Sequence, residues 1–306
     1  MNALVLGGNG FIGSQLVTRL IACGHRVRVF DRAPTSNALS SVEYFSGDFA
    51  THSDFTSVLD GCDLVFHLIS TSLPSASNED PISDVQGNLI STLRLLDQMK
   101  RLGIKRLVFP SSGGTVYGQA QYSPIDESHP TQPIVSYGAT KLAIEKFLNI
   151  YRNSFGFRPI CLRISNPYGP GFRSNAPKGA IGAFLHRVLN DQPIDLWGTG
   201  EIRRDYLYIE DLIDAMIAAI TYVGDHHVFN ISTGKGTSLL EVIDLVQQAT
   251  GKKVSIQKHE SRTFDVQTNI LSNQLAQNEL RWKPVTPLMQ GIEYTTAWLR
   301  TKLEIY

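Results

Sequence analysis

The feature that most constrains this 306-residue chain is a glycine-rich turn near its amino end. Residues 3–6 are expected to form a short apolar strand, and glycines then recur at a GxxGxxG spacing before a helix expected over 13–23. Glycine permits the positive φ of a tight turn and lets a phosphate approach the backbone, while free N–H groups at the helix start face negative charge. The spacing predicts a dinucleotide-binding βαβ unit. The turn residues expected to contact the dinucleotide are Gly7, Gly10, Phe11, Ile12 and Gly13.

An aspartate ends the second expected strand, residues 26–30, about 20 residues after the glycines. A carboxylate there accepts the ribose hydroxyls of NAD and repels the 2′-phosphate of NADP, so Asp31 favours NAD. Arg32 follows directly and would favour NADP, which remains the alternative. Asp48 and Phe49 follow a possible third strand and are expected at the adenine edge, unless Asp48 is only a solvated turn residue.

Strand-like and helix-like segments alternate through the first half of the chain. The expected strands at 63–68, 106–110 and 158–164 are separated by helices at 85–102 and 137–155. Such βαβ units predict an α/β Rossmann-type parallel sheet flanked by helices. After residue 166 the alternation breaks, which predicts a smaller C-terminal substrate lobe. We expect domains at 1–165 and 166–306, with parts near 198–230 returning to the first.

Overall charge and composition exclude several classes of partner. The chain has 28 basic and 28 acidic residues, so it has no net positive charge that would attract nucleic acid or an anionic membrane. No apolar run reaches the roughly 18 to 20 residues of a membrane span, and no secretory leader is apparent. Cys23, Cys62 and Cys161 are scattered among apolar residues and are expected to be buried, reduced thiols rather than a metal site. These features favour a cytoplasmic protein.

A tyrosine and a lysine stand at positions i and i+4 of the expected helix 137–155. Tyr137 and Lys141 therefore lie on one helix face, where the lysine cation is expected to lower the pKa of the phenol and make it a usable base. A YxxxK spacing alone is common. Here it follows a dinucleotide turn and a serine-rich strand end at 109–118, and this combination predicts a catalytic pair.

Together these motifs resemble the NAD-dependent epimerase/dehydratase family of extended short-chain dehydrogenases/reductases, and within it most closely the UDP-glucose 4-epimerases. The resemblance covers nearly the whole chain. It implies Tyr137 as the catalytic base and Lys141 as a ligand of the nicotinamide ribose. It also implies NAD contacts by Asn88 and by the segment Leu68, Ile69 and Ser70, which is bulkier here than is usual in the family.

The assisting hydroxyl of the family is less obvious. Aligned on Thr-Val-Tyr-Gly, the usual serine position is Gly113. Alternation along an extended segment puts Gly113 and Thr115 on the same side, so we prefer Thr115, with Ser112 second and Ser111 as a structural hydrogen-bonding residue.

The same resemblance assigns the substrate residues. Asn166 and two arginines are expected at a substrate diphosphate, which suits bidentate guanidinium groups. Trp197 is expected to cradle the nucleotide base, with a plain core role as its alternative, while Asp205 and Asp211 are expected to be structural. The expected set is Asn166, Trp197, Arg204, Arg262 and Asp265.

The resemblance implies a nucleotide-sugar 4-epimerase of the UDP-glucose/UDP-galactose type, working by transient oxidation to a 4-keto sugar. Dehydratases and decarboxylases of the family need a carboxylic acid where this chain has Gly114 and Thr115. An NAD(P)-dependent 4-keto-sugar reductase, or a catalytically idle NAD-binding protein, remains as an alternative. A homodimer through the helices at 85–102 and 137–155 is also expected.

Overall fold

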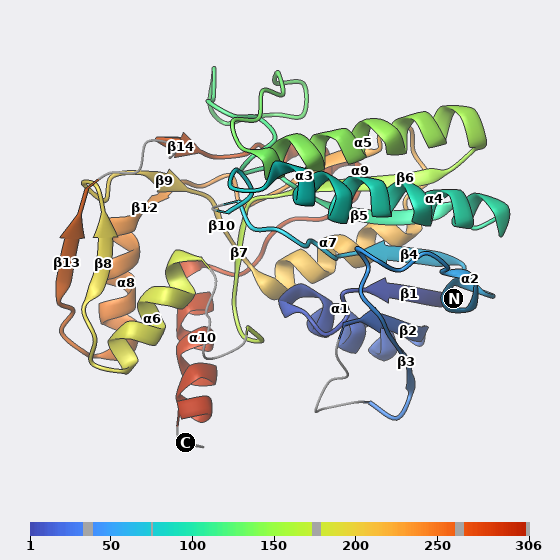
Figure 1. The fold of residues 1–306 in the computed structure, drawn as a ribbon. Coiled ribbons are helices and arrows are strands. Elements are labelled where there is room, and N and C mark those ends of the chain that lie inside the picture. Colours follow the sequence, from blue (N-terminus) through green and yellow to red (C-terminus); the bar gives the residue numbers. More distant parts are fainter. Residues whose placement is uncertain (33–38, 75, 173–178, 261–265, 304–306) are drawn as a thin grey trace. The chain divides into compact units, whose positions relative to one another are not determined.

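The computed structural model describes residues 1–32, 39–74, 76–172, 179–260 and 266–303 (Figure 1). The strands are β1 (Asn2–Leu6), β2 (Arg26–Asp31), β3 (Val42–Ser46), β4 (Leu64–His67), β5 (Arg106–Ser112), β6 (Arg158–Ile164), β7 (Asn166–Tyr168), β8 (Ile194–Trp197), β9 (Arg203–Arg204), β10 (Tyr206–Tyr208), β11 (Val228–Ile231), β12 (Thr237–Ser238), β13 (Ile256–His259) and β14 (Thr268–Asn269). The helices are α1 (Phe11–Ala22), α2 (Thr56–Leu59), α3 (Pro81–Asp84), the π-helical η1 (Val85–Ile90), α4 (Ser91–Arg101), α5 (Ser136–Phe155), α6 (Ala180–Leu189), α7 (Ile209–Thr221), α8 (Leu239–Thr250), α9 (Gln274–Glu279) and α10 (Leu288–Leu303).

In the described chain, seven strands form one sheet in the order β11-β6-β5-β4-β1-β2-β3. The pairings of β1 with β2 and β4, of β2 with β3, and of β4 with β5 are parallel. Figure 1 shows α4 and α5 on one face of this sheet and α1 on the other. The expected α/β Rossmann-type sheet is confirmed.

The core of the sheet is apolar on both faces because each face is covered by helices. Leu4, Leu6 and Phe30 are fully buried on the strands, and Leu95 and Leu96 of α4 pack into the same cluster. Register brings Leu6 opposite Phe30 on one side and His67 on the other. The turn after β1, Asp31 and the loop after β4 therefore emerge at one edge of the sheet.

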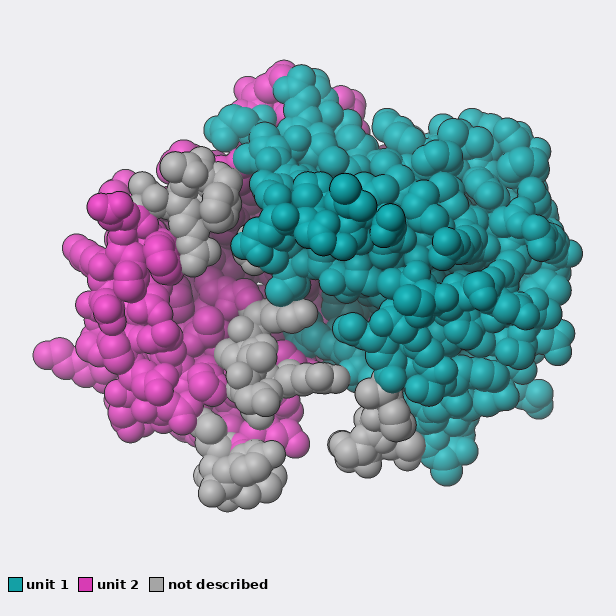
Figure 2. Space-filling view, viewed as in Figure 1, with its two compact units in different colours: residues 1–119, 130–163, 216–229 teal, residues 120–129, 164–215, 230–306 magenta. Residues whose placement is uncertain are grey.

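The chain divides into two compact units, coloured in Figure 2. The first contains residues 1–119, 130–163 and 216–229, and the second contains 120–129, 164–215 and 230–306. The returning segment is 216–229, narrower than the expected 198–230. The sequence did not predict that residues 120–129 belong to the second unit.

The second unit is built from small sheets and helices. β13 pairs in parallel with β8, β7 with β10, and β9 joins β12 and β14, while α6, α8 and α10 pack together. A capping box starts α8: the Ser238 hydroxyl accepts from the Glu241 N–H, and the Glu241 carboxylate accepts from the Ser238 N–H.

Two further expectations can be compared with the fold. No helix in the described ranges has the length and apolarity needed to cross a bilayer. Cys62 and Cys161 are buried free thiols, but Cys23 is exposed, because it is the C-cap residue of α1 and lies beyond its packed face. The expectation of three buried thiols was wrong for Cys23.

Candidate active site

The glycine turn between β1 and α1 can only be closed by residues without side chains. Gly7 has φ +83°, and its N–H donates to the Phe30 carbonyl across 2.8 Å. A Cβ on Gly13 would lie 2.7 Å from the Gly8 Cα and closer still to the Gly7 carbonyl oxygen. Gly10 is the N-cap residue of α1 and has no side-chain cap. The helix therefore begins directly against the glycine turn, which is where the first N–H groups of a helix can bind a pyrophosphate.

Asp31 holds the neighbouring position at the end of β2. Its carboxylate accepts from the Asn9 N–H across 3.0 Å and from the Arg32 N–H across 2.7 Å. These bonds fix the acid beside the glycine turn, as expected for the residue that binds the ribose of a dinucleotide. The Arg32 side chain is exposed.

The two residues expected at the adenine edge differ in exposure. Asp48 is exposed, and its Oδ1 accepts from the Ala50 N–H across 2.9 Å. The ring of Phe49 is only 1% exposed and packs against Phe55 and His67. The Phe49 ring is thus part of the core, and only its backbone remains for a cofactor contact.

Asn88 organises the loop after β4. Its Oδ1 accepts from the Thr71 N–H across 2.8 Å, and its Nδ2 donates to the Asp84 carboxylate across 2.8 Å. In the same loop Leu68 and Ile69 are half-buried and Ser70 is exposed, with Ile69 packed beside Gly7. Within the protein alone, Asn88 therefore positions the loop that borders the glycine turn.

Tyr137 and Lys141 lie on the first turns of α5, and another segment caps this helix. The Tyr137 N–H donates to the Ser77 hydroxyl across 3.0 Å, and the Ser136 N–H donates to Asn78 Oδ1 across 2.8 Å. Lys141 is buried, and its Nζ donates to the Pro110 carbonyl of β5 across 3.0 Å. The first turns of α5 are thereby joined to β5 through Lys141.

The pKa values of this pair differ from the expectation. Burial raises the pKa of Tyr137 to about 12, opposed by a hydrogen bond with Ser70 and reinforced by the charge of Asp84. Burial lowers the pKa of Lys141 to about 8, although Asp84 and then Glu145 raise it. The Lys141 Nζ lies 5.7 Å from the centre of the Tyr137 ring and bonds to Pro110. In the protein alone the expected lowering of the phenol pKa by the lysine was wrong, because desolvation dominates.

Two hydroxyl-bearing residues end β5, and a third follows three residues later. The Ser111 hydroxyl donates to the buried Glu145 carboxylate, so its expected structural role is confirmed. Ser112 is partly buried, and its carbonyl accepts from the Thr115 N–H across 3.2 Å. The Thr115 hydroxyl is buried and has no hydrogen-bonding partner among the described residues. Burying a hydroxyl without a hydrogen bond costs free energy. Of the three hydroxyls, that of Thr115 is therefore the one to which a bound ligand would supply a missing hydrogen bond.

Sequence reasoning missed two buried acids that support the pair. Asp84 accepts from the Ser136 and Thr140 hydroxyls, each across 2.8 Å. Glu145 forms a buried ion pair with Arg163, Nη2 to Oε2 2.7 Å. Glu145 stands four residues after Lys141, so the same helix-face spacing that selected Tyr137 and Lys141 would also have found it. No sequence spacing marks Asp84 in this way, because the residues that donate to it, Ser136 and Thr140, are more than 50 residues away in the sequence.

A cavity of about 530 Å³ lies within the second unit. Of the expected substrate residues it is lined by Asn166, Trp197 and Arg204. Trp197 is 40% exposed and stacks on His259, with ring centres 4.5 Å apart, so a plain core role for it is wrong. The Tyr206 hydroxyl, also at this cavity, is buried without a partner in the described ranges.

The remaining expectations for this unit divide into two groups. Asp205 accepts from the Thr233 and Gly234 N–H groups, both across 2.9 Å, and Asp211 accepts from the Val285 and Thr286 N–H groups, so both acids are structural as expected. Arg262 and Asp265 lie outside the described residues.

The Rossmann sheet, the glycine turn with Asp31, and the Tyr137/Lys141 helix define a protein of the short-chain dehydrogenase/reductase class. A model of the NAD-dependent epimerase/dehydratase family matches residues 3–232, and the chain belongs to this family. NAD is accordingly the cofactor. The glycine turn, which has no room for a side chain at Gly13, fits the pyrophosphate of NAD, and the fixed carboxylate of Asp31 fits its ribose.

Relatives of known name cover the full length. The chain is 32% identical over 312 residues to the UDP-glucose 4-epimerase of Mycolicibacterium smegmatis, with 99% of each chain covered. It is 31% identical over 309 residues to the dTDP-4-dehydro-6-deoxyglucose reductase of Escherichia coli, with 98% of each covered. The crystal structure of UDP-glucose 4-epimerase with UDP-glucose from Thermotoga maritima superimposes with a TM-score of 0.95 at 31% identity, covering 99% of this chain and all of that one.

Proposed function

We propose that this protein is an NAD-dependent nucleotide-sugar 4-epimerase of the UDP-glucose/UDP-galactose type. The observation that carries the proposal is the joint placement of Tyr137, Lys141 and Thr115. Support comes from Tyr137 and Lys141, which share the first turns of α5, from the bond of Lys141 to the Pro110 carbonyl, and from the buried Thr115 hydroxyl, which has no hydrogen-bonding partner among the described residues. Relatives named UDP-glucose 4-epimerase support the same reaction.

In this mechanism Tyr137 takes the proton of the sugar 4-hydroxyl and later returns it. NAD, when bound, supplies the hydride acceptor and donor at that carbon, and its positive ring favours the phenolate. Lys141 has a pKa of about 8 and is therefore mostly protonated at neutral pH, so it keeps a cation on the helix face that Tyr137 shares, and this charge also favours the phenolate. The Thr115 hydroxyl donates a hydrogen bond to the sugar oxygen while the proton is transferred.

The residues disfavour two other reactions of the family. Elimination of water and loss of carbon dioxide both need an acid beside the strand-end threonine. Gly114 and Thr115 occupy that stretch and carry no carboxyl group. Epimerisation requires no such acid, because the same base removes and returns one proton.

For the nucleotide part of the substrate we propose the cavity of the second unit. Trp197 offers an exposed aromatic face, Asn166 and Arg204 offer an amide and a guanidinium, and the unpaired Tyr206 hydroxyl supplies a further donor. This set suits a base and a diphosphate. We propose Arg262 and Asp265 as additional contacts to the diphosphate and the nucleotide ribose.

A reductase is the second candidate, and the Escherichia coli relative is the observation that favours it. A 4-keto-sugar reductase would use the same Tyr137 and Lys141, but it would consume one reduced cofactor per turnover. The two reactions therefore differ in their stoichiometry and not in their proton-transfer groups.

The test is to incubate the purified protein with UDP-glucose or UDP-galactose and no added reductant. Interconversion supports the epimerase, whereas turnover of a nucleotide 4-keto sugar only with stoichiometric NADH or NADPH supports the reductase. Tyr137→Phe should lower turnover by about 10²–10⁴-fold with NAD still bound, because it removes only the proton-transfer group. NAD binding without turnover on a panel of nucleotide sugars would point to an idle NAD-binding protein.

We further propose a cytoplasmic homodimer formed through the helices at 85–102 and 137–155. Ile90 and Ile150 are 38% and 48% exposed on these helices, which suits a contact between copies. The buried free thiols Cys62 and Cys161 suit a reducing compartment. Ile150→Lys should shift the protein to monomers in sedimentation velocity.

A further inference from the structure

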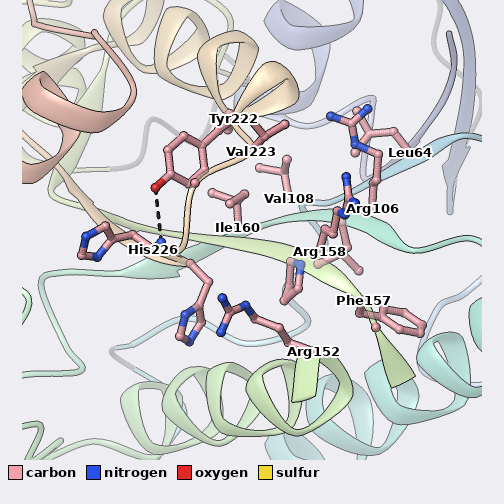
Figure 3. Close-up of a pocket in the computed structure, with 16 residues that line it drawn as sticks. Leu64, Arg106, Val108, Arg152, Phe157, Arg158, Ile160, Tyr222, Val223 and His226 are labelled. Atoms are coloured by element: carbon pink, nitrogen blue, oxygen red, sulfur yellow. Dashed lines mark hydrogen bonds between the residues drawn. The ribbon is translucent and has the colours of Figure 1, made fainter. Parts of the chain in front are cut away.

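A second cavity lies at the opposite edge of the parallel sheet, where its strands begin. Its volume is about 440 Å³, and its lining includes the first residues of three strands: Leu64 of β4, Arg106 of β5 and Arg158 of β6 (Figure 3). The glycine turn follows β1, which runs parallel to β4, and so it lies, like the end of β5, where the parallel strands end. The cavity is therefore separate from the cofactor edge of the same unit.

Positive groups dominate the polar part of this cavity. Arg106, Arg152 and Arg158 line it together with His226 and His227, and no aspartate or glutamate is among its lining residues. In Figure 3 Arg152 and Arg158 lie on the side of α5 and β6, while Tyr222 and Val223 lie across the cavity. An anion entering here meets guanidinium groups from three different elements.

Two of the three arginines are held in place by backbone carbonyls, and neither is neutralised by this contact. Arg106 donates to the Ile220 carbonyl, and Arg152 Nη2 donates to the Asp225 carbonyl across 3.0 Å. Within the described ranges none of the three cavity arginines forms an ion pair with a carboxylate, in contrast to Arg163 with Glu145 and Arg28 with Glu43. Their charges are left for a ligand, and the positive field is felt locally: burial and then the charge of Arg152 lower the pKa of His227.

The other walls are apolar. Val108, Phe157 and Ile160 come from the strands and the turn before β6, and Tyr222 adds an aromatic face. A site that combines apolar walls with a few convergent charges suits a small organic molecule better than a bare ion. Guanidinium groups from several elements match the several oxygens of a phosphate.

We infer that this cavity is a binding site for a small organic phosphate: a phosphate monoester dianion carried on a compact apolar or aromatic body. The arginines bind the phosphate oxygens, and the walls formed by Val108, Ile160 and Tyr222 contact the body. Nothing in this inference depends on the proposed reaction, because it concerns binding alone.

The experiment uses phenyl phosphate as the probe and isothermal titration calorimetry on full-length protein saturated with NAD and UDP. Phenyl phosphate should bind, and its affinity should fall at least tenfold in Arg158→Gln, whose side chain forms no hydrogen bond within the described protein. Arg101→Gln, an exposed arginine of α4 outside the cavity, is the matched control and should leave the affinity unchanged. Phenol, which lacks the dianion, should not bind.

Three results would overturn the inference. One is absence of phenyl phosphate binding to the unaltered protein at millimolar concentration. Another is an affinity equal to that of the unaltered protein in both Arg158→Gln and a second variant, Arg152→Gln. The third is loss of binding in Arg204→Gln with retention in Arg158→Gln, which would assign the probe to the cavity of the second unit. Because turnover is not measured, these outcomes are independent of whether the protein is an epimerase.

Discussion

The Thr140 hydroxyl donates to the Asp84 carboxylate across 2.8 Å, one residue before Lys141. Asp84 is 2% exposed and also accepts from the Ser136 hydroxyl, so one buried acid anchors the start of α5. Its negative charge is the largest influence that opposes the lowering of the Lys141 pKa by burial.

From this follows a prediction for Asp84→Asn. Without the charge the pKa of Lys141 should fall further below about 8, so the lysine loses its proton at a lower pH. We expect turnover at pH 7 to drop at least tenfold and the optimum to move toward acid, measured as a pH profile of kcat. Asp80→Asn makes the same change at an exposed helix cap and should leave the profile unmoved. An unchanged optimum in Asp84→Asn would contradict the electrostatic role.

The assisting hydroxyl can be identified with two substitutions. Thr115→Val keeps the shape and removes the unpaired hydroxyl, and we expect kcat to fall at least tenfold with little change in stability. Ser112→Ala should have a smaller effect. Steady-state kinetics of both variants, together with their unfolding curves, show which hydroxyl contributes more to kcat. If neither substitution lowers kcat tenfold, the assisting hydroxyl is wrongly assigned.

The glycine turn gives a prediction about cofactor binding. Gly13→Ala puts a Cβ into the Gly7 and Gly8 backbone, so we expect NAD binding to be lost and the melting temperature to fall. Gly114→Ala is the matched control, because its Cβ would meet nothing nearer than 4.0 Å and φ there is not positive. NAD affinity by calorimetry and Tm by differential scanning should separate the two variants.

The Glu145–Arg163 pair gives a prediction about stability. Burial lowers the pKa of Arg163, but the hydrogen bonds and charge of Glu145 outweigh this and raise it. Glu145→Gln or Arg163→Met leaves a buried partner uncompensated and should cost about 3–5 kcal/mol of unfolding free energy. The double variant should lose less than the sum of the two, as measured by urea unfolding. Strict additivity would show that the pair is not coupled.

Lys141 also makes stability depend on pH. Its folded pKa of about 8 is below the ordinary 10.5, so between these values the unfolded chain binds more protons and stability rises with pH. Each tenfold change in proton affinity is worth about 1.4 kcal/mol, so the rise approaches about 3 kcal/mol in the NAD-free protein. The raised pKa values of the buried thiols Cys62 and Cys161 act in the opposite direction as the pH passes the ordinary thiol value of 9.0, and the raised pKa of Tyr137 does so above pH 10.

The measurement is urea unfolding between pH 7.5 and 10, with Lys141→Met as the comparison. Methionine fills a similar volume without a charge, so the rise with pH should disappear in that variant. A rise that survives the substitution would mean that another group titrates in this window.

The sheet and its cofactor edge could be read from the sequence because their signals are local. The strand at 158–164 and the helix at 136–155 agree with the predicted segments within one residue, and the capping box at Ser238 has a fixed spacing. Hydrophobic periodicity and turn residues depend on neighbours within a few positions, so they survive without any tertiary information.

What could not be predicted depends on contacts between distant segments. Nothing near Tyr137 indicates that Ser77 caps its helix or that Asp84 joins it, since 60 and 53 residues separate these partners. The burial of the Phe49 ring and the high pKa of Tyr137 likewise follow from packing. Periodicity identifies which residues share a face, but it does not say how deeply that face lies in the protein.

The π-helical turn η1 carries a consequence for how this region tolerates change. A π-helical turn contains one residue more than an α-helical turn, so it offsets the side chains before it from those after it. Asp84 precedes η1 and faces α5, while Leu95 and Leu96 follow it and pack into the sheet core. A chain one residue shorter here would rotate the acid about 100° relative to those leucines. Natural variation should therefore hardly change the number of residues in 85–90, and it should change their identity mainly at exposed positions such as Val85 and Gln86 rather than at the buried Gly87 and Asn88.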